Sequence, residues 1–134
     1  MPYLLAMRMA VVLFILALAA CAKPSPQLAN PASVNCAKVG GRLIVERGAA
    51  GGEVGVCLFQ DNRQCEEWAL FRGHCPKGGV RVAGYVTDAA RHCGIRGGDY
   101  RVTAAAVAGR PEQGTCTLPG RKRCDVHAQY AGKC

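Results

Sequence analysis

The chain has 134 residues, nine of them cysteine, and a formal net charge of +8. This length excludes an assembly of several ordinary domains and leaves one domain or two very small ones. Units of about 45 residues bury little apolar surface, so they usually need disulfides, a metal or a partner for stability.

The first 20 residues are predicted to be a secretory signal peptide. An apolar run covers residues 10–20 behind a single positive charge at Arg8. The run is too short for a transmembrane helix, which needs about 20 apolar residues. A start at Met7 would give a tidier leader and leave the mature chain unchanged.

Cys21 ends this segment, after Leu18-Ala19-Ala20. That pattern resembles the lipobox of bacterial lipoproteins, in which the cysteine is diacylated and becomes the mature N-terminus. We predict lipidation of Cys21 and a membrane anchor; the alternative is an ordinary signal with Cys21 removed or unmodified. Ala22, where aspartate would signal retention, favours the outer membrane by resemblance to enterobacterial sorting. Residues 21–29 then form a polar, proline-containing tether.

Residues 30–78 form the first predicted module. Asn30 suits the N-cap of a helix and Pro31 its first position. Gly73 suits the end of a second helix. The predicted elements are a helix over 31–39, strands over 42–47 and 53–59, and a helix over 65–72.

Residues 79–134 form the second predicted module. Thr87 can cap its first helix. The predicted elements are a helix over 88–96, strands over 99–104 and 112–118, and a helix over 124–131. Residues 80–87 alternate apolar and polar side chains, so they are either a linker or a strand that joins the two hairpins into one sheet. We favour the strand.

The two modules share one cysteine frame. Successive cysteines are separated by 20, 7 and 9 residues in the first module and by 22, 7 and 9 in the second. Glycine and alanine positions between them also agree. We infer a duplication and a small, disulfide-rich α+β fold of two tandem helix–β-hairpin–helix modules.

Eight cysteines remain for disulfides, which persist in the oxidising compartments that exported proteins reach. Each module allows three connectivities. We favour the pairs Cys36–Cys57, Cys65–Cys75, Cys93–Cys116 and Cys124–Cys134. Zinc ligands usually include cysteines two to four residues apart, and no such pair occurs, so we expect neither a metal nor another cofactor.

Catalytic constellations are not evident in the sequence, and we expect a non-enzymatic protein. Glu66 and Glu67 are adjacent and are interpreted as surface charges near a helix N-terminus. Trp68 follows them. It could anchor a partner, but we favour packing of its ring on the hairpin, with the indole N–H at the rim.

Positive charge gathers in the second module. Residues 31–78 hold six Lys or Arg and five Asp or Glu, whereas residues 79–134 hold nine and four. Arg121, Lys122 and Arg123 form the densest cluster. A basic face suits anionic partners such as lipid head groups, lipopolysaccharide phosphates or wall polymers; the alternative is a solvated surface without a partner. Nucleic acid is not expected for an exported lipoprotein.

Several stretches of the first module resemble one known family. They are Asn30-Pro31-Ala32-Ser33 with Cys36, Gly52-Glu53-Val54-Gly55-Val56-Cys57, and Cys65-Glu66-Glu67-Trp68-Ala69-Leu70-Phe71-Arg72-Gly73. Together they resemble the small bacterial lipoproteins labelled hemolysins and catalogued as domain of unknown function 333. The resemblance implies haemolysis without a mechanism or a catalytic residue. The second module departs from the pattern: it lacks the Asn-Pro-Ala-Ser start and has His127 in the Trp68 position.

These features predict an outer-membrane-tethered lipoprotein that binds an envelope or extracellular partner through a basic surface. Direct lysis is not expected, because pore formation would need long amphipathic strands or apolar helices beyond the leader. The alternative function is inhibition of a secreted protease or lysozyme, since compact disulfide modules often present suitable loops.

Overall fold

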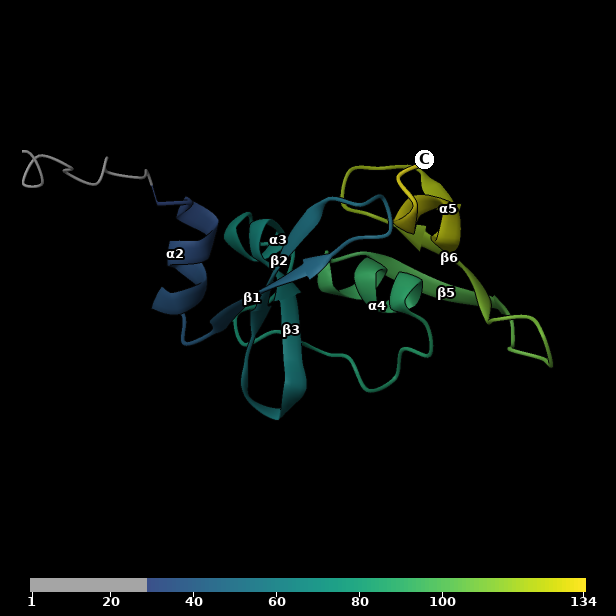
Figure 1. Ribbon diagram of the computed structural model, residues 1–134, viewed down its shortest axis with the longest axis horizontal. Coiled ribbons are helices and arrows are strands. Elements are labelled where there is room, and N and C mark those ends of the chain that lie inside the picture. The colour runs from purple at the N-terminus through teal and green to yellow at the C-terminus, as the bar shows by residue number, and fades with distance from the viewer. Residues whose placement is uncertain (1–28) are drawn as a thin grey trace, which may run out of the picture.

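The computed structural model describes residues 29–134 of the chain. The predicted signal peptide, Cys21 and all but the last residue of the tether lie outside the described residues. Within residues 29–134, no helix has the length and apolar character needed to cross a membrane. The described fold is α+β, with short helices packed around two antiparallel sheets (Figure 1).

The first module contains a four-stranded sheet in the order β1-β2-β3-β4. Its strands are β1 (Arg42–Arg47), β2 (Glu53–Leu58), β3 (Arg63–Glu66) and β4 (Val80–Arg81). Its helices are α2 (Pro31–Lys38), α3 (Glu67–Phe71) and the single 3-10 turn η1 (Gln60–Asn62). The β1–β2 hairpin and the first helix follow the sequence prediction closely.

The second module contains a three-stranded sheet in the order β5-β6-β7. Its strands are β5 (Asp99–Ala104), β6 (Gln113–Thr117) and β7 (Arg123–Asp125), and its helices are α4 (Asp88–Ile95) and α5 (Val126–Tyr130). Apart from η1, the element order repeats that of the first module up to its second α-helix, which supports the inferred duplication.

Side chains cap the first helix of each module as predicted. The Asn30 side chain accepts a hydrogen bond from the Ala32 amide at 3.0 Å. The Thr87 hydroxyl accepts one from the Ala90 amide at 3.1 Å. Each cap satisfies one of the amides that a helix start leaves without a partner.

The start of each second helix was predicted wrongly. Cys65 and Cys124 lie on β3 and β7, opposite Cys57 and Cys116 of the neighbouring strands. Both helices begin only after an acidic residue whose side chain caps them from an extended or near-extended backbone position. Pairing with the hairpin therefore overrides the helical pattern at these cysteines, and each module has the order helix, hairpin, strand and helix.

Residues 80–87 do not join the two hairpins into one sheet, contrary to the favoured prediction. Val80 and Arg81 pair with β3 of the first sheet, and among the described residues the two sheets remain separate. The turn before β4 contains Gly78 and Gly79 at positive φ, which favours glycine. A Cβ on Gly79 would lie 2.7 Å from the Gln64 amide nitrogen, so this turn must pack directly on β3.

The cysteines form the four pairs favoured from the sequence. Cys36–Cys57 ties α2 to β2, and Cys93–Cys116 ties α4 to β6. The other two bridges close the strand–helix units β3–α3 and β7–α5 onto the segments that follow them. Buried cysteines make up much of the core in each module.

A third apolar cluster joins the modules. Val56 from the first sheet, Val82 from the connection and Ile95 from α4 are 0%, 8% and 1% exposed. Beside this cluster, Arg91 of α4 forms a forked ion pair with Glu46 of β1, with nitrogen–oxygen distances from 2.6 to 3.0 Å. The first helix of the second module thus packs against the first sheet, and the two modules form one body.

Candidate functional site

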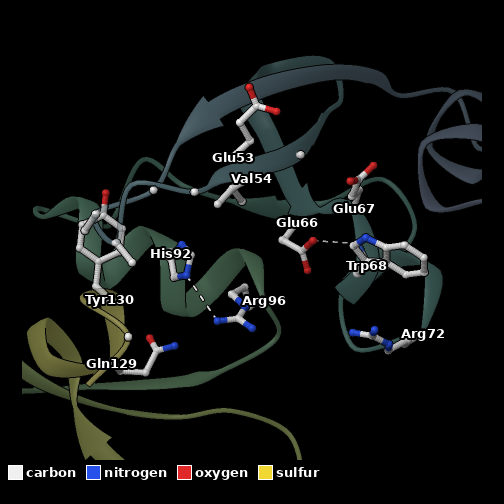
Figure 2. A pocket seen from close by; sticks show the side chains of 16 residues that line it. Glu53, Val54, Glu66, Glu67, Trp68, Arg72, His92, Arg96, Gln129 and Tyr130 are labelled. Carbon is white, nitrogen blue, oxygen red and sulfur yellow. Dashed lines mark hydrogen bonds between the residues drawn. The ribbon is translucent and has the colours of Figure 1, made fainter. Parts of the chain in front are cut away.

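The largest feature shared by the modules is a hollow of about 410 Å³, shown in Figure 2. The loop between β1 and β2 and the helix α3 form one side, and α4 and α5 form the other. Its volume lies within the usual range for small-molecule sites, roughly 300–1,000 Å³. We call it the wide hollow; its labelled side chains are Glu53, Val54, Glu66, Glu67, Trp68, Arg72, His92, Arg96, Gln129 and Tyr130.

Two further hollows adjoin it. The basic hollow, of about 510 Å³, is lined by Arg96, Cys116, Leu118, Arg121, Lys122, Arg123, Cys124, Gln129, Gly132 and Cys134. The small hollow, of about 160 Å³, is lined by Glu66, Ala69, Arg72, His74, Arg96, Leu118, Pro119 and Arg121. Arg96 lines all three hollows. We call the three together the inter-module groove.

Arg96 stands at the centre of this groove, directly after α4. Its Nη1 lies 3.4 Å from Nε2 of His92, one turn earlier on the helix (Figure 2). Burial lowers the pKa of His92 from 6.5 to about 4, and the positive charges of Arg96 and Arg91 act in the same direction. The ring is therefore neutral near pH 7, so Nε2 can accept a hydrogen bond from the guanidinium. The His92 ring also contacts Tyr130, with centroids 5.1 Å apart.

Trp68 lies on the opposite wall and is partly buried, rather than part of a core cluster. The favoured prediction that its ring packs as core is therefore not met, because the neighbouring Ala69 and Leu70 fill the core side of α3. The Arg72 guanidinium carbon lies 5.3 Å from the Trp68 ring centroid, and the Phe71 ring meets Trp68 edge-on at 5.8 Å. These contacts hold both Trp68 and Arg72 at the groove.

The basic cluster predicted from the sequence also reaches the groove. Arg121, Lys122 and Arg123 are exposed and line the basic hollow. The sequence did not indicate that Arg72 and Arg96 would join them, since those residues come together only through packing of the modules. Within residues 29–134, none of these five cations forms an ion pair, because the pairs found there are Arg91–Glu46 and Arg101–Asp99.

Glu66 and Glu67 have different tasks, although they are adjacent. Both oxygens of Glu66 accept amide hydrogen bonds at the start of α3, from Trp68 and Ala69 at 2.9 Å each. The position of Glu66 thus agrees with the predicted role near a helix N-terminus. The prediction that Glu67 lies on the surface is wrong, because this residue is only 7% exposed.

The buried Glu67 carboxylate is held by the start of α2. Asn30 Nδ2 donates to its Oε1 at 3.1 Å, and Ser33 Oγ donates to its Oε2 at 2.6 Å. A Cβ on Gly55 would lie 2.4 Å from Glu67 Cδ, so only glycine leaves room for this carboxylate on β2. We call these four residues the carboxylate clamp; they join separate parts of the motif on which the family resemblance depends.

The second module has lost the clamp as a set. Thr87 replaces Asn30, Ala90 replaces Ser33, and Val126 replaces Glu67. Ala90 and Val126 are both fully buried, so apolar side chains stand at the positions of Ser33 and the charged Glu67. Gly114 is retained for another purpose, since a Cβ there would lie 2.4 Å from the Tyr100 ring. Asn30, Ser33 and Glu67 are present together in the first module and replaced together in the second. This shared pattern could have indicated the clamp from the sequence, but the sequence analysis did not use it.

Metal ligation finds no support in the described part of the chain. No group of three or more His, Cys, Asp or Glu side chains in residues 29–134 is arranged to hold an ion. The groove instead offers guanidinium and ammonium groups, the rings of Trp68 and Tyr130 and the amide of Gln129, together with the carboxylates of Glu53, Glu66 and Glu67 along the wide hollow. This arrangement suits binding of an anion with attached polar groups.

Comparison with known proteins places the first module. Residues 27–74 match a family described as Domain of unknown function (DUF333). Over 48 residues the chain is 33% identical to "Uncharacterized protein YdbJ" of Escherichia coli strain K12, and equally to the protein of that name from strain O6:H1. The match covers 36% of this chain and 54% of each relative, so the chain spans about half the length of the curated relatives it matches. No solved structure matches the chain.

Proposed function

We propose that this protein is a lipid-anchored lipoprotein of the bacterial outer membrane that binds an anionic component of the envelope or its surroundings. The resemblance to lipoproteins labelled hemolysins supports the compartment, and we propose binding without catalysis or lysis as the activity. The inter-module groove is the proposed binding surface. Residue Cys21 is the proposed point of attachment.

One observation carries the proposal: five cations from both modules line three adjoining hollows and lack ion-pair partners in the described structure. Solubility requires charge anywhere on the surface, and does not require cations to be collected at a concave surface. In a groove with protein walls, their potentials add and raise the local concentration of anions. The whole chain carries a net charge of +8, which favours the same class of partner.

The proposed anchor is compatible with this use of the groove. The nine tether residues could span about 30 Å when extended, and the described chain enters through α2 at the end of the molecule opposite α5 (Figure 1). An attached protein could therefore extend from the bilayer with its groove accessible to polymers or lipids.

Binding of the lipid-free protein to isolated envelope fractions tests this function. Replacing Arg121, Lys122 and Arg123 together by alanine should weaken binding at least about tenfold at low salt, and wild-type binding should fall steeply as salt rises. A control with Arg42, Arg81 and Arg110 replaced by alanine removes the same charge from exposed positions outside the groove. Equal losses in both variants would show that net charge, and not the groove, is responsible.

A second function, inhibition of a secreted protease or lysozyme, is favoured by the β5–β6 hairpin. Residues 101–111 are all exposed, and the hairpin extends from the body (Figure 1). Two backbone hydrogen bonds between Val107 and Arg110 hold its tip. A rigid, protruding tip can enter an enzyme cleft at little entropic cost. Cleaving or shortening 105–111 should abolish inhibition while leaving anion binding intact.

A further inference from the structure

We propose that the small hollow binds a phosphate monoester. The inference rests on the proposed function and specifies its ligand chemistry: a doubly charged, tetrahedral phosphate carried by a sugar or by a lipid. The binding groups are the guanidiniums of Arg72, Arg96 and Arg121.

These arginines come from three separate segments. Arg72 follows α3, Arg96 follows α4, and Arg121 lies in the turn between β6 and β7. The first belongs to one module and the other two to its copy, so the site exists only because the modules pack together. All three line the same space of about 160 Å³, which has room for one phosphate.

Each arginine has a local support that leaves donors free. Arg72 stacks over the Trp68 ring, and Arg96 contacts the neutral His92 through one Nη. The turn that carries Arg121 is closed by its amide, which donates to the Leu118 carbonyl at 2.9 Å. Guanidinium groups bind phosphate oxygens in forked pairs, and prior positioning lowers the entropy lost on binding.

The charge of the small hollow matches a dianion. Among its lining residues Glu66 is the one carboxylate, and both of its oxygens are occupied by amides of α3. Three guanidiniums and one carboxylate leave a net charge that a phosphate monoester, close to −2 near pH 7, would balance. A phosphodiester or a carboxylate carries one negative charge and would leave part of the site unpaired.

The adjoining wide hollow has room for the group that carries the phosphate. It shares Glu66, Arg72 and Arg96 with the small hollow. Gln129 also lines it, and its side-chain amide could hydrogen-bond a hydroxyl or amine of the group that carries the phosphate. This chemistry favours a phosphorylated sugar over a lipid.

Trp68 provides the readout, because it is the single tryptophan of the chain and contacts Arg72. Glucosamine 6-phosphate should change its fluorescence, and calorimetry should show binding at least about tenfold tighter than for glucosamine, since charged hydrogen bonds are lost without the phosphate. Vesicles containing phosphatidic acid, a monoester, are compared with vesicles containing phosphatidylglycerol, a diester. Preference for the sugar phosphate or for phosphatidic acid supports the proposal and identifies the source of the phosphate.

Two variants locate the site. Arg121→Ala should weaken glucosamine 6-phosphate binding at least about tenfold, and Arg96→Lys should weaken it while keeping the charge, because the fork is lost. Arg81→Ala, an exposed residue outside the groove, is the matched control and should bind as the wild type. Unchanged thermal unfolding of each variant shows that the fold is retained.

The outcomes separate this inference from the proposed function. If envelope binding depends on Arg121, Lys122 and Arg123 but neither monoester binds better than its unphosphorylated or diester partner, the inference is overturned and the proposed function stands. Equal weakening by Arg81→Ala would also overturn it. If neither the envelope fractions nor the phosphate probes bind, both are wrong.

Discussion

Gly55 and Glu67 show how one residue can determine another far away in the sequence. The carboxylate lies where a side chain on residue 55 would be, and two donors from the start of α2 hold it there. Desolvating an acidic group is costly unless it is hydrogen-bonded. The clamp therefore makes four residues of the first module interdependent.

Gly55→Ala should lower the free energy of unfolding by about 1–3 kcal/mol, because the added methyl group would overlap Glu67 and force it from its donors. Urea unfolding of the oxidised, lipid-free chain measures this loss. Gly84→Ala is the matched control, since a Cβ there meets no atom within 4 Å. A loss at Gly84 equal to that at Gly55 would remove the steric explanation.

Glu67→Val should lower stability by about 1–3 kcal/mol, since the partly buried donors of Asn30 and Ser33 would lose their acceptor. Adding Asn30→Thr and Ser33→Ala gives the first module the residues of the second. The triple variant should recover part of the loss, as measured by the same unfolding experiment. Strictly additive losses would contradict the interdependence of the clamp.

The free energy of unfolding should fall as pH decreases from 6.5 to 4, because His92 takes up a proton in the unfolded chain but not in the folded one. Its folded pKa of about 4 lies below the unfolded value of 6.5, so the unfolded chain binds the proton first in this window. We expect a contribution of roughly 1–2 kcal/mol for this partly exposed ring. This loss of stability is absent well above pH 6.5 and complete well below pH 4.

Replacing His92 with glutamine should flatten the pH dependence between 6.5 and 4, measured as the free energy of unfolding against pH. His74→Gln serves as the matched control, because it makes the same substitution at an exposed histidine. If the wild type and His92→Gln have the same slope, His92 does not account for the change in stability.

Among elements, those with local signals were predictable from the sequence. The two N-caps, the glycines that end the first helices and the alternating strands of the first hairpin all act over a few residues. Strands β3 and β7 were missed, because their extended state depends on pairing with the preceding strand. Their residues, such as Arg63 and Gln64, carry no strand pattern of their own.

The contact of α4 with the first sheet should contribute substantially to stability. Ile95 is 1% exposed in the cluster between the modules, so Ile95→Ala should cost about 2–4 kcal/mol. Val86→Ala is the matched control, because Val86 is 69% exposed and its loss should stay within about 0.5 kcal/mol. Denaturant unfolding with intact disulfides compares the two variants. Similar small losses would mean that the modules are not coupled through this cluster.

At the scale of the whole molecule, the sequence indicated some of the cations of the inter-module groove and not others. The consecutive basic residues 121–123 are visible in the sequence, and their place at a concave surface follows the expected basic face. Arg72 and Arg96 are isolated in the sequence, and no local pattern relates them. Their convergence comes from packing of α4 against the other module, which depends on Val56, Val82 and Ile95.

The exchange of Glu67 for Val126 also bears on how two copies of one ancestral unit could diverge. If the acid were lost first, its partly buried donors would have no acceptor, and if the donors were lost first, the buried acid would have no partner, so each single step lowers stability. A disulfide typically contributes about 2–4 kcal/mol, which is comparable to that deficit. If the two modules derive from one unit, the sulfur bridges present in both could offset such a loss, so that the polar interior of one half could change while its helix and hairpin were kept.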